Sequence, residues 1–380
     1  MWGWVLPGMG RALACIALAG AQVAAAQETA ASAKWAVGMS TALTGPNARY
    51  GNGLAQGVRA AFARFNAAAE GRGVELLLRD DEGQPDKAVA NTRELLQARV
   101  VALTGYRGAA SLEAVMPLID SNPTPMVGAA SSAESLRTPP RRWLFNLRAA
   151  AGEETAAMVY HLDTIGIEKI AAIAQDDGLG RAGLEGIRLE LVRIGTRPVA
   201  VGRVSARPLP AEMEEAVRQV CAAGPQAVLL ALDAPSALAA LRNARQRGCR
   251  SQFYLLSETG SDLVHTGAPL ADLAGVVVSQ VLPSPIRPAH PLVADYLQDL
   301  AREAGSVPGY ASLEGYLYGR VLTDAVRQCG RAVTRECIIS ALATGRAAAP
   351  GYRLQFSPDQ RRGSNFVELT MIGPDGKFRR

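Results

Sequence analysis

Three loops of the chain carry small and hydroxylic residues whose chemistry suits an acidic ligand. They span residues 40–46, 104–108 and 128–132, and each follows an apolar run that predicts a buried strand. Because open α/β sheets bind ligands at the carboxyl ends of their strands, these loops would face a common site. Their hydroxyl and backbone N–H groups can hold a carboxylate. Their spacing is equally consistent with ordinary loop residues.

A Gly-x-Gly-x-x-Gly motif at residues 178–183 points to a different chemistry, the binding of a dinucleotide. In that chemistry a pyrophosphate rests on the N-terminus of the following helix. Here Asp176 and Asp177 place two carboxylates where the phosphates would lie. Arg203, at the end of the next predicted strand, replaces the acid expected at a ribose hydroxyl, although it could suit a 2′-phosphate. We interpret the motif as a glycine-bearing loop at a helix start and keep an exported nucleotide-dependent oxidoreductase as an unfavoured alternative.

The sequence contains none of the common catalytic or metal-binding motifs. A Gly-x-Ser-x-Gly nucleophile elbow, a His-Glu-x-x-His zinc motif and a phosphate-binding P-loop are all absent. His161, His265 and His290 are widely spaced and no Cys-x-x-Cys pair occurs, so no metal site is expected. We therefore expect a protein that is not an enzyme and that needs no cofactor.

The N-terminus has the pattern of an export signal. Arg11 is followed by an apolar run over residues 12–26 that ends in a small-x-small site at residues 24–26. A transmembrane anchor is the alternative, but this run is shorter than the roughly 20 residues needed to span a bilayer. A lipoprotein attachment at Cys15 fits poorly, because the apolar run continues beyond it. We expect a signal peptide over residues 1–26, cleaved after Ala26.

Four cysteines remain after this cleavage, and an exported chain can pair them in three ways. Cys329 and Cys337 flank the end of one predicted helix and the start of the next, so their Cα atoms can approach to the distance that a disulfide needs. We predict that these two are paired. The pairing of Cys221 with Cys249 stays open.

The chain has 380 residues, which is enough for two hydrophobic cores. Its formal net charge is only +5 and its aromatic content is 5%, which argues against a nucleic-acid-binding surface. Glycine and proline, with 38 and 22 residues, are too few for a disordered or collagen-like chain.

Apolar strands and amphipathic helices alternate twice along the sequence. This alternation predicts an α/β fold with two doubly wound parallel-sheet lobes. A block of three helices over residues 292–344 has no strands between them, and a strand-like tail covers residues 352–356 and 366–372. We therefore predict lobes that are discontinuous in sequence, with residues 34–147 plus 281–349 in lobe one and residues 148–280 plus 350–380 in lobe two.

Several short segments resemble the leucine/isoleucine/valine-binding protein family. The likeness runs from about residue 34 to the C-terminus and rests on the order and spacing of segments that are individually unspecific. The segments are Leu43-Thr44-Gly45-Pro46 with Gly51, Asp80-Asp81-Glu82 with Pro85, Gln175-Asp176-Asp177-Gly178-Leu179-Gly180, and Tyr310-Ala311-Ser312-Leu313-Glu314-Gly315-Tyr316.

The resemblance implies a type I periplasmic-binding fold, with two lobes joined by multiple hinge crossings. It also implies a periplasmic, monomeric substrate-binding protein that captures an amino acid or a related small carboxylate or amide, closes on it by hinge motion, and delivers it to an ABC permease in the inner membrane. A sensor that presents the ligand to a membrane receptor is the alternative with the same fold. The sequence does not name the ligand.

The resemblance further implies a ligand site between the lobes. Lobe one would hold the acid end of the ligand through the loops after its third and fourth strands, and lobe two would meet the ammonium through Ser257 or Glu258. Two departures weaken the case for a branched-chain amino acid, since Leu179 and Asp233 stand where the family often has aromatic residues. Asp233 could instead face a cationic group of the ligand, and Arg107 could face an extra carboxylate or amide. The expected ligand-binding residues are Gly105, Tyr106, Arg107, Ser131, Ser132, Leu179, Asp233, Ser257 and Glu258.

Overall fold

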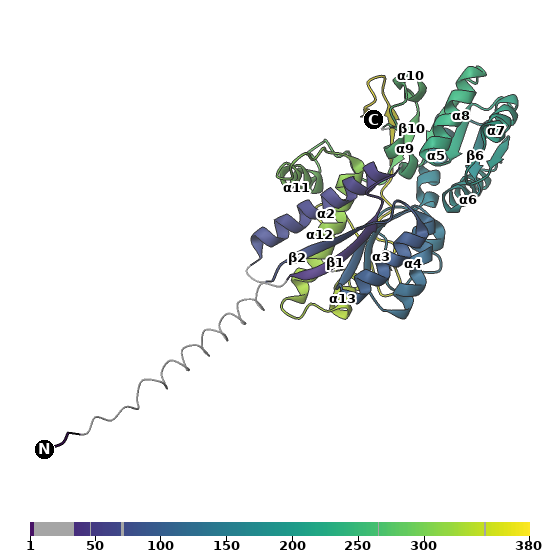
Figure 1. The fold of residues 1–380 in the computed structure, drawn as a ribbon. Coiled ribbons are helices and arrows are strands. Elements are labelled where there is room, and N and C mark those ends of the chain that lie inside the picture. The colour runs from purple at the N-terminus through teal and green to yellow at the C-terminus, as the bar shows by residue number, and fades with distance from the viewer. Residues whose placement is uncertain (4–33, 46, 70–71, 265, 346) are drawn as a thin grey trace.

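The structure is a computed structural model that describes residues 1–3, 34–45, 47–69, 72–264, 266–345 and 347–380. The expected cleavage after Ala26 lies outside the described residues. Two β-sheets, one parallel and one largely parallel, are each covered by helices on both faces and form two lobes (Figure 1). The α/β class with two doubly wound sheets is therefore confirmed.

Lobe one is built on a sheet with the strand order β2-β1-β3-β4-β5, in which all neighbours are parallel. Near-continuous apolar runs form these strands because both sheet faces are buried. Helices α3 and α4 cover one face, and α2, α11, α12 and α13 cover the other. The elements are β1 (Trp35–Thr41), α2 (Ala48–Ala68), β2 (Val74–Asp80), α3 (Pro85–Gln97), β3 (Ala102–Arg107), α4 (Ala109–Ser121), β4 (Met126–Ala130), the 3₁₀ helix η1 (Glu134–Leu136), β5 (Leu144–Phe145), α11 (Pro291–Leu300), α12 (Tyr310–Cys329) and α13 (Arg335–Ala343).

Lobe two is built on a sheet with the strand order β12-β11-β10-β9-β8-β6-β7. Strands β6 to β10 are parallel, whereas the C-terminal hairpin of β11 and β12 adds to the sheet edge in antiparallel fashion. Helices α5 and α6 pack on one face, and α7 and α8 on the other. The elements are α5 (Ala151–Thr164), β6 (Ile170–Gln175), α6 (Gly178–Arg193), β7 (Val201–Val204), α7 (Pro210–Ala222), β8 (Ala227–Ala231), α8 (Ala234–Gln246), β9 (Gln252–Leu255), α9 (Ser257–Leu263), α10 (Leu270–Leu273), β10 (Val277–Gln280), β11 (Glu368–Ile372) and β12 (Phe378–Arg379).

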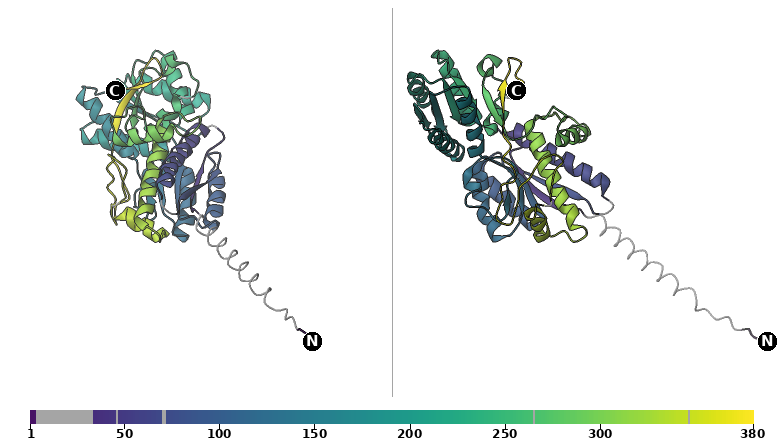
Figure 2. Two further views of the ribbon diagram at one scale, coloured as in Figure 1. Left: turned by 90° about the vertical axis from the view of Figure 1, so that its left-hand side faces the viewer. Right: turned by 180° about the vertical axis from the view of Figure 1, so that it is seen from behind.

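The chain passes between the two sheets three times. It leaves lobe one after β5, returns after β10, and crosses again before β11, so that the C-terminal strand lies with the second lobe (Figure 2). The last crossing comes later than expected. Tyr352 and Phe356 belong to the core of lobe one, where the Phe356 ring lies edge-on to Phe145 at 5.3 Å. These aromatic side chains hold the predicted strand at residues 352–356 against lobe one, and this segment forms no regular strand.

Helices α2 and α12, which are far apart in sequence, lie side by side in lobe one (Figure 1). Glycines make this approach close. A Cβ atom on Gly57 would lie 1.9 Å from the carbonyl oxygen of Ser312, and one on Gly315 would lie 2.0 Å from that of Leu54. Any larger residue at either position would force the helices apart. The helical block after β10 is therefore an integral part of lobe one.

Both cysteine pairs lie at disulfide distance. The Cα atoms of Cys329 and Cys337 are 5.9 Å apart, which agrees with the pairing that the sequence predicts. This disulfide connects the end of α12 to the start of α13. The pair that the sequence left open, Cys221 and Cys249, has a Cα separation of 5.8 Å. Each disulfide therefore connects two parts of the same lobe, and neither connects one lobe to the other.

Candidate functional site

The carboxyl ends of β3 and β4 in lobe one face α9 in lobe two, and charged side chains meet there. Arg107, the last residue of β3, donates to the Asp262 carboxylate at 2.5 Å. Its guanidinium also lies 4.3 Å from the centre of the Tyr50 ring. Both members of the ion pair are largely buried, with side-chain exposures of 12% and 19%. Burial foremost raises the pKa of Asp262, as does Glu258, while Arg107 opposes the change.

The loop after β4 binds a carboxylate in this structure. The backbone N–H and the hydroxyl of Ser132 both donate to Oε2 of Glu258, at 3.1 and 3.0 Å. Ser132 is fully buried, and Glu258 projects from α9 of the opposite lobe. Two donors converging on one oxygen atom are the arrangement that a carboxylic acid ligand requires.

A buried polar cluster lies beside these contacts at the first crossing between the lobes. Arg148 contacts Oε1 of Glu314 at 3.3 Å, Oε1 of Glu154 at 3.6 Å and the Ser257 hydroxyl at 2.5 Å. Glu314 belongs to α12 of lobe one, whereas Glu154 and Ser257 belong to lobe two. A single guanidinium therefore connects both lobes and neutralises part of the charge of two carboxylates.

Burial sets the protonation of this cluster. Burial, followed by the nearby Glu314, raises the pKa of the Tyr50 hydroxyl, which donates a hydrogen bond to that carboxylate. The Tyr318 hydroxyl donates to the other Glu314 oxygen at 2.5 Å, and its pKa is raised for the same reasons. Burial also raises the pKa of Glu154, although Arg148 opposes this change. Two neutral tyrosine hydroxyls thus each donate a hydrogen bond to the Glu314 carboxyl group.

Five of the nine expected ligand-binding residues lie where the lobes meet. Arg107, Ser132, Ser257 and Glu258 make the contacts between lobes described above. Ser131 lies next to Ser132, and its buried hydroxyl accepts a hydrogen bond from the N–H of Ala133 at 3.3 Å.

The other four expected residues serve the structure of their own lobes. Gly105 is packed tightly, since a Cβ there would lie 2.6 Å from Met39. Tyr106 differs from the expectation: its side chain points into the core between β3 and α3, and its hydroxyl lies 2.9 Å from that of Thr92. Leu179 packs on the α5/α6 core of lobe two.

Asp233 also acts within its lobe. It is the N-cap of α8, and its carboxylate accepts a hydrogen bond from the N–H of Ser236 at 2.9 Å. The Gln175 side chain binds the Asp233 N–H at 2.7 Å. The Asp233 carboxylate therefore caps the N-terminus of α8. This capping role by itself accounts for an aspartate at position 233.

The Gly-x-Gly-x-x-Gly motif has a structural explanation. Asp177 caps α6 by accepting a hydrogen bond from the Gly180 N–H at 2.8 Å. A Cβ on Gly180 would lie 1.9 Å from the carbonyl oxygen of Gln175, and one on Gly183 would lie 2.6 Å from Ala231. The glycines thus allow α6 to pack against its own sheet, and a carboxylate already occupies the helix N-terminus.

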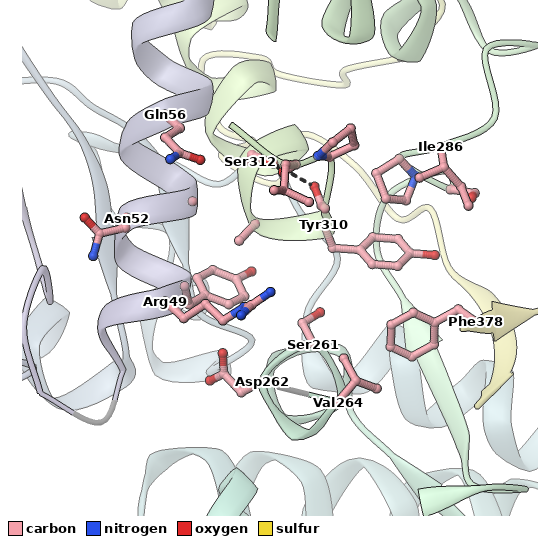
Figure 3. Close-up of a pocket in the computed structure, with 18 of the residues that line it drawn as sticks. Arg49, Asn52, Gln56, Ser261, Asp262, Val264, Ile286, Tyr310, Ser312 and Phe378 are labelled. Atoms are coloured by element: carbon pink, nitrogen blue, oxygen red, sulfur yellow. Dashed lines mark hydrogen bonds between the residues drawn. The ribbon is translucent and has the colours of Figure 1, made fainter. Parts of the chain in front are cut away.

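A cavity of about 470 Å³ opens next to the Arg107–Asp262 ion pair. Figure 3 shows α2, with Arg49, Asn52 and Gln56, on one side and α9, with Asp262, opposite it. The remaining wall is lined mainly by apolar side chains, with Ser284, Ser312 and Lys377 among them. The rings of Tyr310 in α12 and Phe378 in β12 meet there edge to face at 5.5 Å. Both lobes therefore contribute to a space that is bordered by the ion pair at one end and by an aromatic pair at the other.

The sequence motifs did not single out all residues of the site. Tyr50, Arg148, Asp262 and Glu314 were not expected there, yet they contact the predicted residues directly or through one neighbour. Glu314 lies inside the 310–316 segment that carries the family resemblance, so that segment contained a signal for it. Arg148 carried no local signal, because its partners come from distant parts of the chain.

Within the described residues, no group of three or more His, Cys, Asp or Glu side chains is placed to hold a metal ion. None of the described helices combines the length and the apolar character that crossing a membrane requires. The polar groups at the lobe boundary are hydrogen-bond donors, arginines and carboxylates, which suits the binding of a small charged molecule.

Comparison with known proteins relates this architecture to binding proteins. An extracellular ligand-binding receptor from Verminephrobacter eiseniae shares 25% identity, covers 92% of this chain and 100% of its own, and superposes with a TM-score of 0.83. A possible leucine/isoleucine/valine-binding protein from Rhodopirellula baltica shares 27% identity over 92% and 97% of the two chains, with a TM-score of 0.80. A substrate-binding periplasmic protein from Ralstonia solanacearum shares 27% identity over 90% and 99%, with a TM-score of 0.79.

No curated protein sequence matches the chain. A family model described as periplasmic binding protein matches residues 34–377, which is nearly the whole described chain. The sequence resemblance to the leucine/isoleucine/valine-binding type is thereby confirmed. The chain belongs to the periplasmic binding protein family, and it is a solute-binding protein and not an enzyme.

Proposed function

We propose that the protein captures an amino acid, or a related small carboxylate or amide, between its two lobes and delivers it to an ABC importer. Members of the periplasmic binding protein family are exported to the periplasm, where such a ligand would be collected. In this proposal the ligand's acid end binds lobe one and its amino end faces lobe two.

The observation that carries the proposal is the carboxylate bound at Ser132. The buried N–H and hydroxyl groups of this residue already converge on a carboxylate oxygen. A ligand's carboxylate can make the same two hydrogen bonds once Glu258 turns away. The freed Glu258 carboxylate then becomes the partner of the ligand's ammonium group.

The cavity beside the Arg107–Asp262 ion pair supports the proposal by offering space for the rest of the ligand, although Ser132 and Glu258 do not themselves line it. Its volume of about 470 Å³ falls within the range of small-molecule sites. It adjoins Arg107 through Tyr50 and Asp262, which both line it. The aromatic pair Tyr310 and Phe378 would contact an apolar side chain of the ligand.

Titration calorimetry against a panel of amino acids, their amides and their deaminated analogues tests the ligand class. For a ligand that the wild type binds, Ser132→Ala removes one hydrogen bond to a charged group and should weaken binding about tenfold to a hundredfold. Ser135→Ala is the matched control, because Ser135 is exposed in the adjacent 3₁₀ helix η1 and binds Glu113. Unchanged affinity in Ser132→Ala would contradict the proposed site.

Delivery to an importer needs a separate measurement. Vesicles that contain the protein's cognate ABC permease should hydrolyse ATP faster when the protein is added with its ligand. The protein without ligand and the Ser132→Ala variant at the same ligand concentration are the controls. Equal ATPase rates with and without the protein would contradict delivery while leaving ligand capture intact.

A further inference from the structure

Arg137 lies beside the acid-binding loop after β4 (residues 131–133), and backbone carbonyl groups hold its guanidinium. It donates to the carbonyl oxygen of Ser131 at 2.8 Å, to that of Ala133 at 2.9 Å and to that of Arg148 at 3.4 Å. The residue is 2% exposed. An arginine that is buried to this extent usually faces a carboxylate, so its contacts with the loop need another explanation.

Arg137 has no ion-pair partner among the described residues, yet it stays charged at neutral pH. Burial foremost, and then the positive charge of Arg148, lower its pKa to about 10. Glu134 and Glu153 oppose this change from a distance, because their carboxylates contact Arg362 instead, at 2.6 and 3.0 Å. The carbonyl dipoles of the acid-binding loop therefore provide much of the compensation for the charge of Arg137.

One of these carbonyl groups belongs to the peptide unit that serves the acid site. The Ser131 carbonyl and the Ser132 N–H share one planar peptide unit, in which the C=O and N–H bonds point in opposite directions. The carbonyl end binds Arg137 at 2.8 Å, and the N–H end donates to the Glu258 carboxylate at 3.1 Å. Arg137 therefore fixes the direction of the Ser132 N–H.

We propose that Arg137 is a positioning residue that orients and polarises the peptide unit between residues 131 and 132, so that the acid site prefers a charged carboxylate to a neutral amide. This inference rests on the proposed function, because it takes Ser132 as the group that binds the ligand's acid. It adds a residue that touches no ligand and still determines which chemical group the site accepts.

Orientation follows from the hydrogen bonds of the loop. The Ser132 carbonyl oxygen accepts a hydrogen bond from the N–H of Ala151 at 2.9 Å, and the Ala133 carbonyl accepts one from Arg137. Turning the peptide between residues 131 and 132 over would break a charge-assisted hydrogen bond inside the protein. It would also replace the N–H donor by a carbonyl oxygen, which repels a carboxylate.

Polarisation makes the effect depend on the charge of the ligand. A cation at the carbonyl end of a peptide unit draws electron density away from the N–H, which makes the N–H a stronger donor. Hydrogen bonds to a charged acceptor are roughly twice as strong as those to a neutral one. Loss of the Arg137 charge should therefore weaken the binding of an acid more than the binding of the matching amide.

The Ser132 N–H can be observed without a ligand, by NMR on protein labelled with ¹⁵N-serine. The resonance that disappears in Ser132→Ala identifies it. In Arg137→Met we expect the Ser132 amide proton to shift upfield and to exchange with solvent about tenfold faster or more. An unchanged Ser132 resonance in this variant would overturn the proposal.

Arg361 provides a matched control within the same lobe. It is 7% exposed, and its guanidinium also donates to backbone carbonyl groups, those of Arg142 and Ser357. Burial lowers its pKa as well. Because these carbonyl groups lie outside the acid-binding loop, Arg361→Met should reduce stability but leave the Ser132 resonance and ligand affinity unchanged.

Selectivity is tested by calorimetry with two pairs of probes, L-leucine with L-leucinamide and L-phenylalanine with L-phenylalaninamide. Arg137→Met should weaken the binding of the acid about tenfold or more and that of the amide clearly less. Arg137→Lys keeps the charge but not the two-nitrogen fork, so it should lower the affinity and retain the preference for the acid. Equal losses for acid and amide in Arg137→Met would mean that Arg137 only supports the fold, and would overturn the proposal.

Two further outcomes are decided by the same measurements. If Arg137→Met does not fold, a shifted Ser132 resonance in Arg137→Lys together with a retained preference for the acid supports the proposal, and an unshifted resonance overturns it. If neither member of either pair binds the wild type, the proposed ligand class is wrong. The Ser132 resonance then still decides whether Arg137 orients and polarises this peptide unit.

Discussion

Replacing Arg148 by methionine removes the cation that connects the two lobes. Arg148 is 3.3 Å from Glu314 and 3.6 Å from Glu154, and all three side chains have exposures of 2% or less. Removing one partner of a buried ion pair typically costs about 3–5 kcal/mol, because the remaining charge is buried without compensation. At about 2–4 °C per kcal/mol, Arg148→Met should lower the melting temperature by roughly 6–20 °C.

Chemical denaturation and calorimetry measure this loss. A surface pair provides the control, because Arg181 lies 3.1 Å from Asp176 but its side chain is 64% exposed. Arg181→Met should therefore cost less than about 1 kcal/mol. Adding Glu314→Gln to Arg148→Met removes one of the uncompensated charges, so the two changes should show a coupling energy of about 1–3 kcal/mol.

Two results would refute this reasoning. A loss below about 1 kcal/mol in Arg148→Met, or a gain in stability, would mean that the apolar contacts of methionine replace the ion pairs at no cost, as happens for some buried pairs. Strictly additive effects in the double variant would mean that Arg148 and Glu314 do not interact energetically.

Three further predictions concern a buried carboxyl group, a helix cap and the disulfides. Burial raises the pKa of Glu154 in the folded protein above its value in the unfolded chain. The free energy of unfolding should therefore increase as the pH falls from above the folded-state pKa to the unfolded-state pKa. Glu154→Gln should flatten this part of a plot of unfolding free energy against pH. Asp233→Ala should cost about 1 kcal/mol through loss of the α8 N-cap, whereas Asp233→Asn should keep most of the stability; equal losses in thermal unfolding would contradict the capping role. Peptide mapping without reductant should recover Cys329–Cys337 and Cys221–Cys249 as linked peptides, and reduction should cost roughly 2–4 kcal/mol for each pair. Free thiols at these positions in oxidised protein would contradict the pairing.

Apolar runs predicted most of the fold because a parallel strand buried on both faces has a plain sequence signal. The strands near residues 170–175 and 227–231 and the strandless block after β10 are where the sequence indicated. The segment at 352–356 was misjudged because alternation of apolar residues does not distinguish a strand from an extended chain whose aromatic side chains pack on another surface. Its partner, Phe145, is about 200 residues away in sequence.

The sequence predicted those site residues that lie in loops directly after recognisable strands. Ser132 and Glu258 follow strands that the sequence located, and the structure brings them together. Neighbouring residues of a strand point to opposite faces, so the side chain of Tyr106 is buried toward α3 while Arg107 reaches the lobe boundary. Arg148 stayed hidden because a buried arginine is recognised by its partners, and these come from α5, α9 and α12.

The pairing of α2 with α12 has a consequence for how the protein is made. The face of the lobe-one sheet that α2 covers is completed only when α12 packs beside it, and α12 ends at Cys329 of a 380-residue chain. Contacts between such distant segments form slowly, because a long loop must close first. A nascent chain on the ribosome therefore lacks a finished first lobe until α12 has been translated. Until then, the apolar side chains of α2 that later pack against α12 lack their partner and stay exposed to solvent or to other binding partners.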